Sequence, residues 1–173
     1  SVACPAPNTH LAEFIGIMLG DGGVTEYQVS VSCNMRDDAA YITYVSSLME
    51  RLFGVAPKHY VRVDKNCTTL VISSIELREQ LVGHGLILGD KIRGGLHIPQ
   101  WVKDNPDYMR WCLRGLFDTD GGIYLERHKR KSGIYEYPRM AFVSASEPLV
   151  QDVVAGLIQL GLRPKIRQSR YVV

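Results

Sequence analysis

The chain has 173 residues, of which 46% are hydrophobic and 22% charged, with a net charge of +2 and a mean hydropathy of −0.05. This length can bury a core in one domain or in two small halves. No apolar run reaches the roughly 18 residues of a membrane span, and residues 1–8 lack the charged start and apolar core of a signal peptide. We therefore exclude a membrane partner.

The cysteines and the charge distribution indicate where the protein is located and what it binds. Cys4, Cys33, Cys67 and Cys112 lack CxxC spacing, so we expect no zinc site and a reduced intracellular location, in the cytoplasm or an organelle matrix. Residues 1–121 carry 11 Lys+Arg against 14 Asp+Glu, whereas residues 122–173 carry 9 against 4, a local net of +5. This concentration of positive charge is typical of a nucleic-acid contact, although a solvated charged face would also explain it.

In the first half, the predicted order of elements is helix, strand, helix, hairpin and helix. In chain order we expect a helix capped by Asn8 or Thr9 and ending at Gly20, a strand from Val24 to Cys33, a helix from Asp37 to Phe53, hairpin strands Lys58–Val63 and Thr68–Ser73, and a helix from Ile75 to Val82. The hairpin carries Lys58, Tyr60, Arg62 and Lys65 on its outer side. A glycine-rich linker, Leu86 to Leu96, follows.

The second half repeats this order less completely. We expect a helix opened by Asn105-Pro106 and running to Thr119, strands Ile123–Leu125 and Tyr137–Ser144 around a basic loop tip at Arg127–Lys131, a helix from Glu147 to Gly161, and a final strand Arg163–Val173. The first half's second hairpin strand and closing helix have no counterpart. Either the chain is truncated or the second half is naturally reduced.

An internal repeat links the two halves. Phe14–Gly23 and Leu113–Gly122 are both apolar helix ends that finish in an aspartate and two glycines. Gly16 matches Gly115, Gly20 matches Thr119, and Asp21 matches Asp120. Small residues four apart flatten one face of a helix, so we expect the two helices to pack face to face, with Asp21 beside Asp120.

Two adjacent carboxylates at helix C-termini oppose the helix dipoles and repel each other. A hard divalent cation removes both penalties, because it binds carboxylate and carbonyl oxygens. We therefore predict a Mg²⁺ site, which Mn²⁺ or Ca²⁺ can also fill, formed by Asp21 and Asp120 with the adjoining Gly20 and Thr119. A single Asp-Gly-Gly would be most simply a turn, but two copies with the same spacing favour a site.

Both stretches resemble the motif of the LAGLIDADG homing endonucleases. LRGLFDTDGG is close to the family consensus, FIGIMLGDGG is looser, and His97-Ile98-Pro99 is similar to relatives in inteins and archaeal introns. In that family the last acid of each motif holds catalytic metal, which implies a catalytic role for Asp21 and Asp120. Asp118 matches an acid that Leu19 replaces in the first copy, so no metal role is assigned to it.

The resemblance implies an α+β fold of two αββαββα units related by a pseudo-twofold axis and packed through their motif helices. Residues 1–96 would form the first repeat with its linker, and residues 97–173 the second, C-terminally short one. We expect a monomer with internal pseudo-symmetry.

The implied function is a site-specific endonuclease that makes a staggered break in a long, asymmetric double-stranded DNA target by metal-dependent hydrolysis. The expected DNA-binding residues are Lys58, Arg62, Lys65, Arg127, Lys129, Arg130, Lys131, Arg139, Lys165, Arg167, Gln168 and Arg170. Intein-type relatives often carry a lysine where this chain has Leu96, and Lys91 or Arg93 would then supply the catalytic-site cation.

Two other functions fit the same resemblance. A splicing maturase or a transcription regulator would bind RNA or DNA without cutting it. Loss of one motif acid would have favoured this alternative, but this chain keeps both. An intein would need a nucleophile at its start and a His-Asn end, whereas this sequence finishes Tyr171-Val172-Val173.

Overall fold

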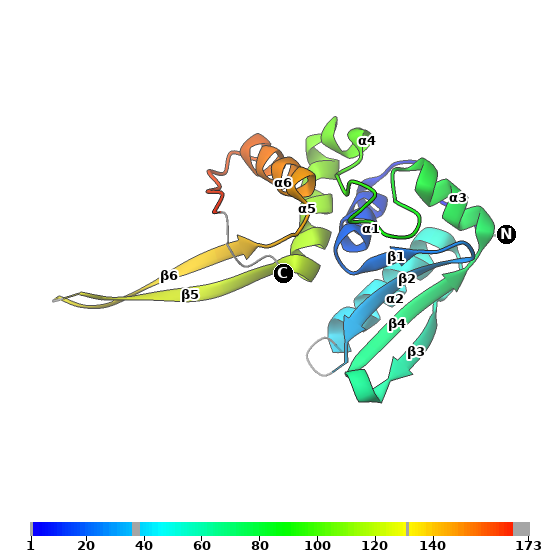
Figure 1. Cartoon of the computed structure of the whole chain (residues 1–173), viewed down its shortest axis with the longest axis horizontal. Coiled ribbons are helices and arrows are strands. Elements are labelled where there is room, and N and C mark those ends of the chain that lie inside the picture. The colour runs from blue at the N-terminus through cyan, green and yellow to red at the C-terminus, as the bar shows by residue number, and fades with distance from the viewer. Residues whose placement is uncertain (1, 36–38, 131, 168–173) are drawn as a thin grey trace.

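The first half of the chain forms a complete αββαββα unit. In the computed structural model, which describes residues 2–35, 39–130 and 132–167, this unit comprises α1 (Thr9–Gly20), β1 (Gly22–Val24), β2 (Gln28–Asn34), α2 (Ala39–Phe53), β3 (Lys58–Arg62), β4 (Cys67–Ser73) and α3 (Ile75–Gly83) (Figure 1). A single 3₁₀ turn, Val63–Lys65, joins β3 to β4. The predicted single strand Val24–Cys33 is wrong: the chain turns after Val24, where the Thr25 N–H donates to the Gln28 carbonyl at 2.9 Å.

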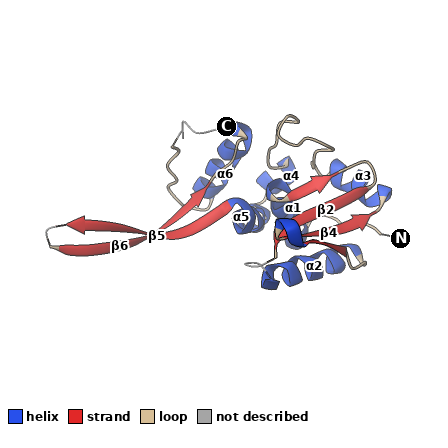
Figure 2. Ribbon diagram, turned by 60° about the horizontal axis from the view of Figure 1, so that its bottom comes forward, coloured by secondary structure: helices blue, strands red, loops and turns tan. Residues whose placement is uncertain are grey.

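The four strands form one antiparallel sheet in the order β1-β2-β4-β3. Its inner face is apolar because Val29, Val31 and Leu70 alternate with polar residues along the strands and are fully buried. These side chains join α1, α2 and α3 in one hydrophobic core. In the described ranges, no helix covers the opposite face of the sheet (Figure 2).

The second half is an αββα arrangement. It comprises a short α4 (Gln100–Lys103), α5 (Pro106–Asp120), β5 (Gly121–Arg130), β6 (Gly133–Phe142) and α6 (Glu147–Gln159). The two strands pair along their whole length and project as a ribbon away from the helices (Figures 1 and 2). The α+β class and the complete-plus-partial repeat are thus as predicted.

Three sequence-based predictions for the second half need correction. The strands are longer than expected, so Arg127–Arg130 belong to β5 and form no loop tip. The pairing with β6 continues through this stretch, with Arg127 in register with Glu136 and Lys129 in register with Ile134. Residues 162–167 are coil where the final strand was predicted to begin, and residues 168–173 lie outside the described part. α4 was not foreseen.

The motif helices α1 and α5 lie side by side between the two halves (Figure 1). Nine consecutive residues of α1, Leu11 to Leu19, are buried, although α1 carries Glu13 among them. α5 buries one face, with Met109, Cys112, Leu113, Gly115 and Leu116. None of the helices in the described ranges has the length and apolar character needed to cross a bilayer.

Candidate metal centre and nucleic-acid interface

Small residues bring the two motif helices into backbone contact. A Cβ placed on Gly16 would lie 2.0 Å from the Cys112 carbonyl oxygen, and one on Gly115 would lie 2.2 Å from the Glu13 carbonyl oxygen. Real Cβ atoms do not approach other atoms so closely, so any side chain at either position would force the helices apart. The structure therefore has α1 and α5 packed through their small-residue faces, as predicted.

The same packing sets the two helix C-termini beside each other. A Cβ on Gly20 would lie 2.0 Å from Thr119 Oγ1 and 3.3 Å from Asp120 Oδ2. Asp21 follows Gly20 directly and caps α1, with its N–H donating to the Ile17 carbonyl at 3.0 Å. Asp120 is the last residue of α5. Gly20, Asp21, Thr119 and Asp120 are thus brought together.

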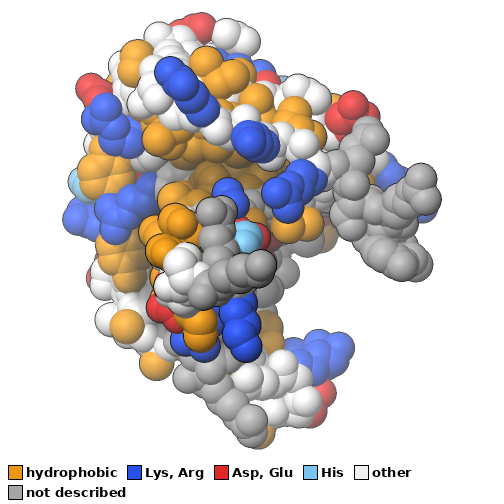
Figure 3. All heavy atoms as spheres, turned by 90° about the vertical axis from the view of Figure 1, so that its left-hand side faces the viewer, with side chains coloured by type: hydrophobic (Ala, Val, Ile, Leu, Met, Phe, Trp, Pro, Cys, Tyr) orange, Lys and Arg blue, Asp and Glu red, His pale blue; other side chains and the backbone are white. Residues whose placement is uncertain are grey.

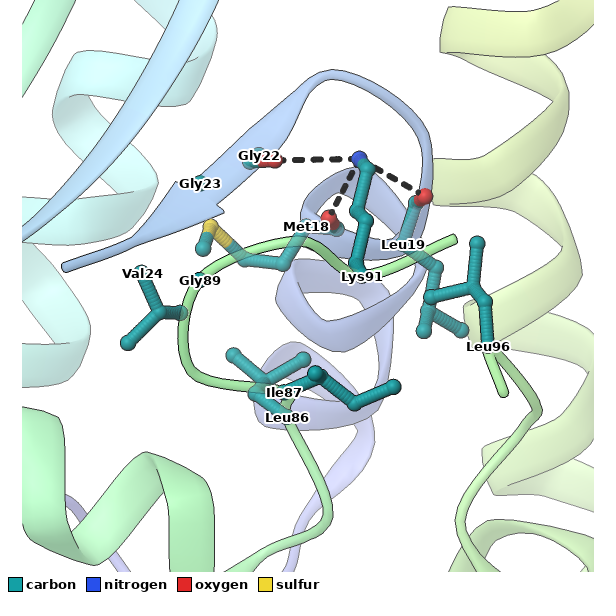
Figure 4. A pocket seen from close by; sticks show the side chains of 10 residues that line it. All are labelled: Met18, Leu19, Gly22, Gly23, Val24, Leu86, Ile87, Gly89, Lys91 and Leu96. Carbon is teal, nitrogen blue, oxygen red and sulfur yellow. Dashed lines mark hydrogen bonds between the residues drawn. The ribbon is translucent and has the colours of Figure 1, made fainter. Parts of the chain in front are cut away.

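A lysine from the linker occupies this junction. The Lys91 ammonium donates to the carbonyl oxygens of Leu19 and Gly22 at 3.0 Å and to that of Met18 at 3.3 Å (Figure 4). It also donates to the carbonyl oxygen of Gly20. We call these four oxygens the carbonyl cluster. Arg93, the other cation expected here, is 90% exposed on its side chain and pairs with Asp90 at 3.4 Å. Of these two cations, the linker brings Lys91 to the site, and Leu96 is buried.

The charges at the junction influence one another. Burial raises the pKa of the Asp120 carboxyl, and the nearby Lys91 ammonium partly offsets this. Burial lowers the pKa of Lys91, which the carboxylates of Asp120 and Asp21 partly restore. Lys91 therefore lies within electrostatic reach of both motif acids. Among the described residues, no three His, Cys, Asp or Glu side chains gather into a metal-binding group, so a metal here would need backbone oxygens as well.

A buried ionic cluster beside the junction was missed by sequence reasoning. Glu13 is fully buried in α1, accepts a hydrogen bond from Tyr44 Oη at 2.6 Å, and lies 3.4 Å from Arg114 Nε of α5. The Arg114 guanidinium also lies over the rings of Tyr44 and Trp111. The available signal was an acid inside the otherwise apolar run Leu11–Leu19, because a buried charge requires a partner.

The uncovered face of the large sheet carries cations and hydroxyls. Antiparallel partners share a face, so the register aligns Ser30 with Val71 and Lys58, and Ser32 with Thr69 and Tyr60. Arg62 continues the series at the end of β3. His59 lies on the other face, where its Nε2 is 3.1 Å from Ser46 Oγ of α2. Lys58 and Arg62 are therefore on the face that no helix covers.

The ribbon divides its cations between two faces. Arg139 is in register with Tyr124, next to Glu126 and Tyr137, whereas Arg127 faces Glu136 and Lys129 faces Ile134 on the opposite side. When Asp120 is matched with Asp21, Ile123 becomes the counterpart of buried Val24. Side chains alternate along a strand, so Arg127 and Lys129 lie on the same face of β5 as Ile123, the face that corresponds to the core of the first unit. Arg139 lies on the side that corresponds to the uncovered face.

The remaining predicted DNA-binding residues do not share one surface in the part of the chain that the structure describes. Lys65 is exposed in the 3₁₀ turn, and Lys165 and Arg167 are exposed in coil. Arg130 ends β5, and Lys131, Gln168 and Arg170 fall outside the described residues. Figure 3, viewed from the ribbon side, shows Lys and Arg side chains spread among apolar ones. The predicted cations that the structure describes are therefore not gathered into one patch.

Comparison with known proteins agrees with this architecture. Residues 107–172 match the family model of the LAGLIDADG-like domain. The meganuclease I-SmaMI, solved bound to uncleavable DNA, superimposes with a TM-score of 0.60 at 12% identity, over 96% of this chain and 76% of that one. A lysine-to-alanine mutant of I-SmaMI gives a TM-score of 0.57 at 12% identity, over 97% and 77%.

A curated relative matches most of the chain in sequence. The replication factor C small subunit of Methanocaldococcus jannaschii is 29% identical over 165 residues, which is 94% of this chain. The chain spans only 8% of the length of that relative. The paired motif helices, the complete-plus-partial repeat and the match of residues 107–172 to the LAGLIDADG-like domain model make the chain similar to the LAGLIDADG family.

Proposed function

We propose that this chain is a site-specific DNA endonuclease that makes a staggered double-strand break in a long, asymmetric target by metal-dependent hydrolysis. One observation carries the proposal: two packed helices place Asp21 and Asp120 at adjacent C-termini, with Gly20 and Thr119 between them. Resemblance to meganucleases solved with DNA supports a double-stranded DNA partner, and the internal pseudo-symmetry supports a monomer.

The donor set at the junction fits a divalent cation. The Asp21 and Asp120 carboxylates would hold Mg²⁺ together with backbone oxygens at Gly20 and Thr119, and Mn²⁺ or Ca²⁺ would use the same oxygens. The carbonyl cluster already engages a cation, the Lys91 ammonium. When bound, the metal would neutralise the phosphate and lower the pKa of a water that attacks it.

The protein's own residues would bind and orient the DNA. Lys58 and Arg62 on the uncovered sheet face, and Arg139 on the corresponding ribbon face, would contact phosphates. The middle of the same sheet face carries side chains that would meet base edges in a major groove. These are the hydroxyls of Ser30, Ser32 and Thr69 and the ring of Tyr60. Because the first sheet has four strands and the second has two, the two halves of the target would be read differently.

A second function also has an observation in its favour. Leu96 is buried at the position where the intein-type proteins that this sequence resembles often carry a lysine. The Lys91 ammonium is bound to carbonyl oxygens instead of reaching outward. Such a site favours a non-cleaving binding protein, either an intron-splicing maturase or a transcription regulator.

One experiment separates the two functions. The chain would be incubated with a plasmid library that carries randomised inserts, in Mg²⁺ and in EDTA, and the broken ends would be sequenced. An endonuclease yields one recurring site in Mg²⁺ only, and Asp21→Asn abolishes the cutting while a gel-shift assay still shows binding to that site. Binding without cutting in Mg²⁺ or Mn²⁺ would instead support the non-cleaving function.

A further inference from the structure

Lys91 occupies an environment built for a cation with more ligands than an ammonium can use. Four carbonyl oxygens lie within hydrogen-bonding distance of its Nζ, but an ammonium has only three N–H donors. Three of these oxygens are terminal carbonyls of α1, which carry the negative end of the helix dipole. A spherical ion with six or more oxygen ligands uses such a cluster more completely than a lysine does.

The position of Lys91 is set by the chain on both sides of it. The Gly89 N–H donates to the Val24 carbonyl at 2.8 Å, and Leu96 is buried in the core. Between these anchors, the Asp90 carboxylate accepts the N–H groups of Ile92 and Arg93 at 3.1 and 3.2 Å. The linker backbone is therefore fastened to the first unit, and the flexible four-carbon side chain of Lys91 is the part that can leave without disturbing it.

We propose that Lys91 is a tethered cation that competes with the divalent metal for the junction. Its ammonium neutralises the end of α1 and the two motif acids while no metal is bound, and metal entry displaces it. Lys91 would thereby lower the metal affinity of the free protein. This inference rests on the proposed metal site at Asp21 and Asp120.

The first test measures metal affinity without DNA or catalysis. Ca²⁺ is titrated into the wild-type chain and Lys91→Met, and affinity is read from the rise of melting temperature with Ca²⁺. Because a unit positive charge a few ångströms away opposes a divalent ion, removing it should tighten Ca²⁺ binding on the order of tenfold. In EDTA the variant should melt lower than the wild type, since the carbonyl cluster loses its donor.

A matched control replaces a lysine away from the junction. Lys103→Met breaks the 2.6 Å ion pair with Asp152 between α4 and α6, so it should lower stability without changing Ca²⁺ affinity. Equal Ca²⁺ affinity in wild type and Lys91→Met would overturn the role of Lys91 and leave the metal site standing. If Ca²⁺ stabilises neither the wild type nor any variant, Lys91→Met included, the role of Lys91 and the proposed metal site are both overturned.

A second measurement uses the wild-type chain and does not depend on the variant folding. Lysines are reductively methylated in EDTA and in Ca²⁺, and the modified peptides are quantified by mass spectrometry. Lys91 should be protected in EDTA and labelled several-fold more in Ca²⁺, whereas exposed Lys129 should be labelled equally in both. Asp120→Asn should abolish the Ca²⁺ effect. Labelling of Lys91 that Ca²⁺ does not change would show that metal leaves the ammonium in place.

Discussion

Gly16 and Cys112 are in backbone contact across the two halves of the protein: a Cβ on Gly16 would lie 2.0 Å from the Cys112 carbonyl oxygen. This contact fixes the distance between α1 and α5, and with it the separation of the motif acids at their ends. A mid-helix glycine costs about 1 kcal/mol of helix stability relative to alanine. The chain carries glycine here despite that cost, because the close approach of the two backbones leaves no room for a Cβ.

Gly16→Ala should therefore destabilise the fold, although alanine is the better helix former. Overpacking costs about 1–3 kcal/mol, which exceeds the gain in propensity, and the obstacle here is backbone that cannot rotate away. Urea denaturation of Gly16→Ala and Gly115→Ala would measure the loss. Gly83→Ala is the control, because a Cβ there meets nothing within 4 Å. Equal stability of Gly16→Ala and Gly83→Ala would contradict the packing.

The ionic cluster between α1, α2 and α5 gives a second prediction. Tyr44→Phe removes the 2.6 Å hydrogen bond to buried Glu13, and a hydrogen bond to a charged group contributes about 1.5–3 kcal/mol. Burial and this bond raise the pKa of Tyr44 to about 12, so the phenol stays a donor throughout the neutral range. Chemical denaturation at pH 7 would measure the loss.

Tyr108→Phe is the matched control for this cluster. Tyr108 Oη donates to the Pro7 carbonyl at 3.0 Å in an exposed position, where water replaces the lost partner. We expect it to cost less than Tyr44→Phe. If the two variants lose equal stability, Glu13 does not depend on Tyr44.

The two faces of the ribbon give a third prediction, for DNA binding. Arg139→Ala should lower the slope of log affinity against log salt by about 0.9, the value of one phosphate contact, because Arg139 lies on the face that corresponds to the uncovered sheet face. Arg127→Ala should leave the slope unchanged, because Arg127 lies on the other face with Glu136. Fluorescence anisotropy over a range of salt would test both. The reverse order would show that DNA meets the opposite face of the ribbon.

Sequence reasoning succeeded where the signal was local and repeated. The matched pairs Gly16/Gly115 and Gly20/Thr119 predicted the helix contact, because backbone approach depends only on side-chain size at those positions. Asn105-Pro106 predicted the start of α5, since cap and proline act within one turn.

The failures depended on long-range geometry. The family resemblance named Lys91 or Arg93 as the site cation, but nothing near Lys91 in sequence indicates that its ammonium binds carbonyls some 70 residues earlier. The turn after Val24 has no Asn-Gly or Asp-Gly signal. The assignment of Arg127 and Lys129 to one DNA side with Arg139 overlooked register, which alternates side chains between faces.

The last prediction concerns the charge on Asp120. Its raised pKa means that the folded protein holds this proton more tightly than the unfolded chain does, so ionisation of Asp120 opposes folding at neutral pH. Asp120→Asn should therefore melt as high as the wild type, or higher, in EDTA at pH 7. The difference should fade as the pH drops through the raised pKa, where the wild-type carboxyl also becomes neutral.

Added metal should reverse that order. Ca²⁺ stabilises only the chain that binds it, so the wild type should gain melting temperature and Asp120→Asn should not, and cleavage by the variant in Mg²⁺ should be lost. Asp118→Asn is the control: its carboxyl lies two residues earlier, 3.9 Å from Arg114, and the variant should keep both the Ca²⁺ shift and the cleavage. A carboxylate binds metal only when it is ionised. As the pH is lowered, the wild type should therefore lose its Ca²⁺ stabilisation at a higher pH than a site with an ordinary aspartate would. A destabilised Asp120→Asn that still cuts DNA would make Asp120 a structural turn residue.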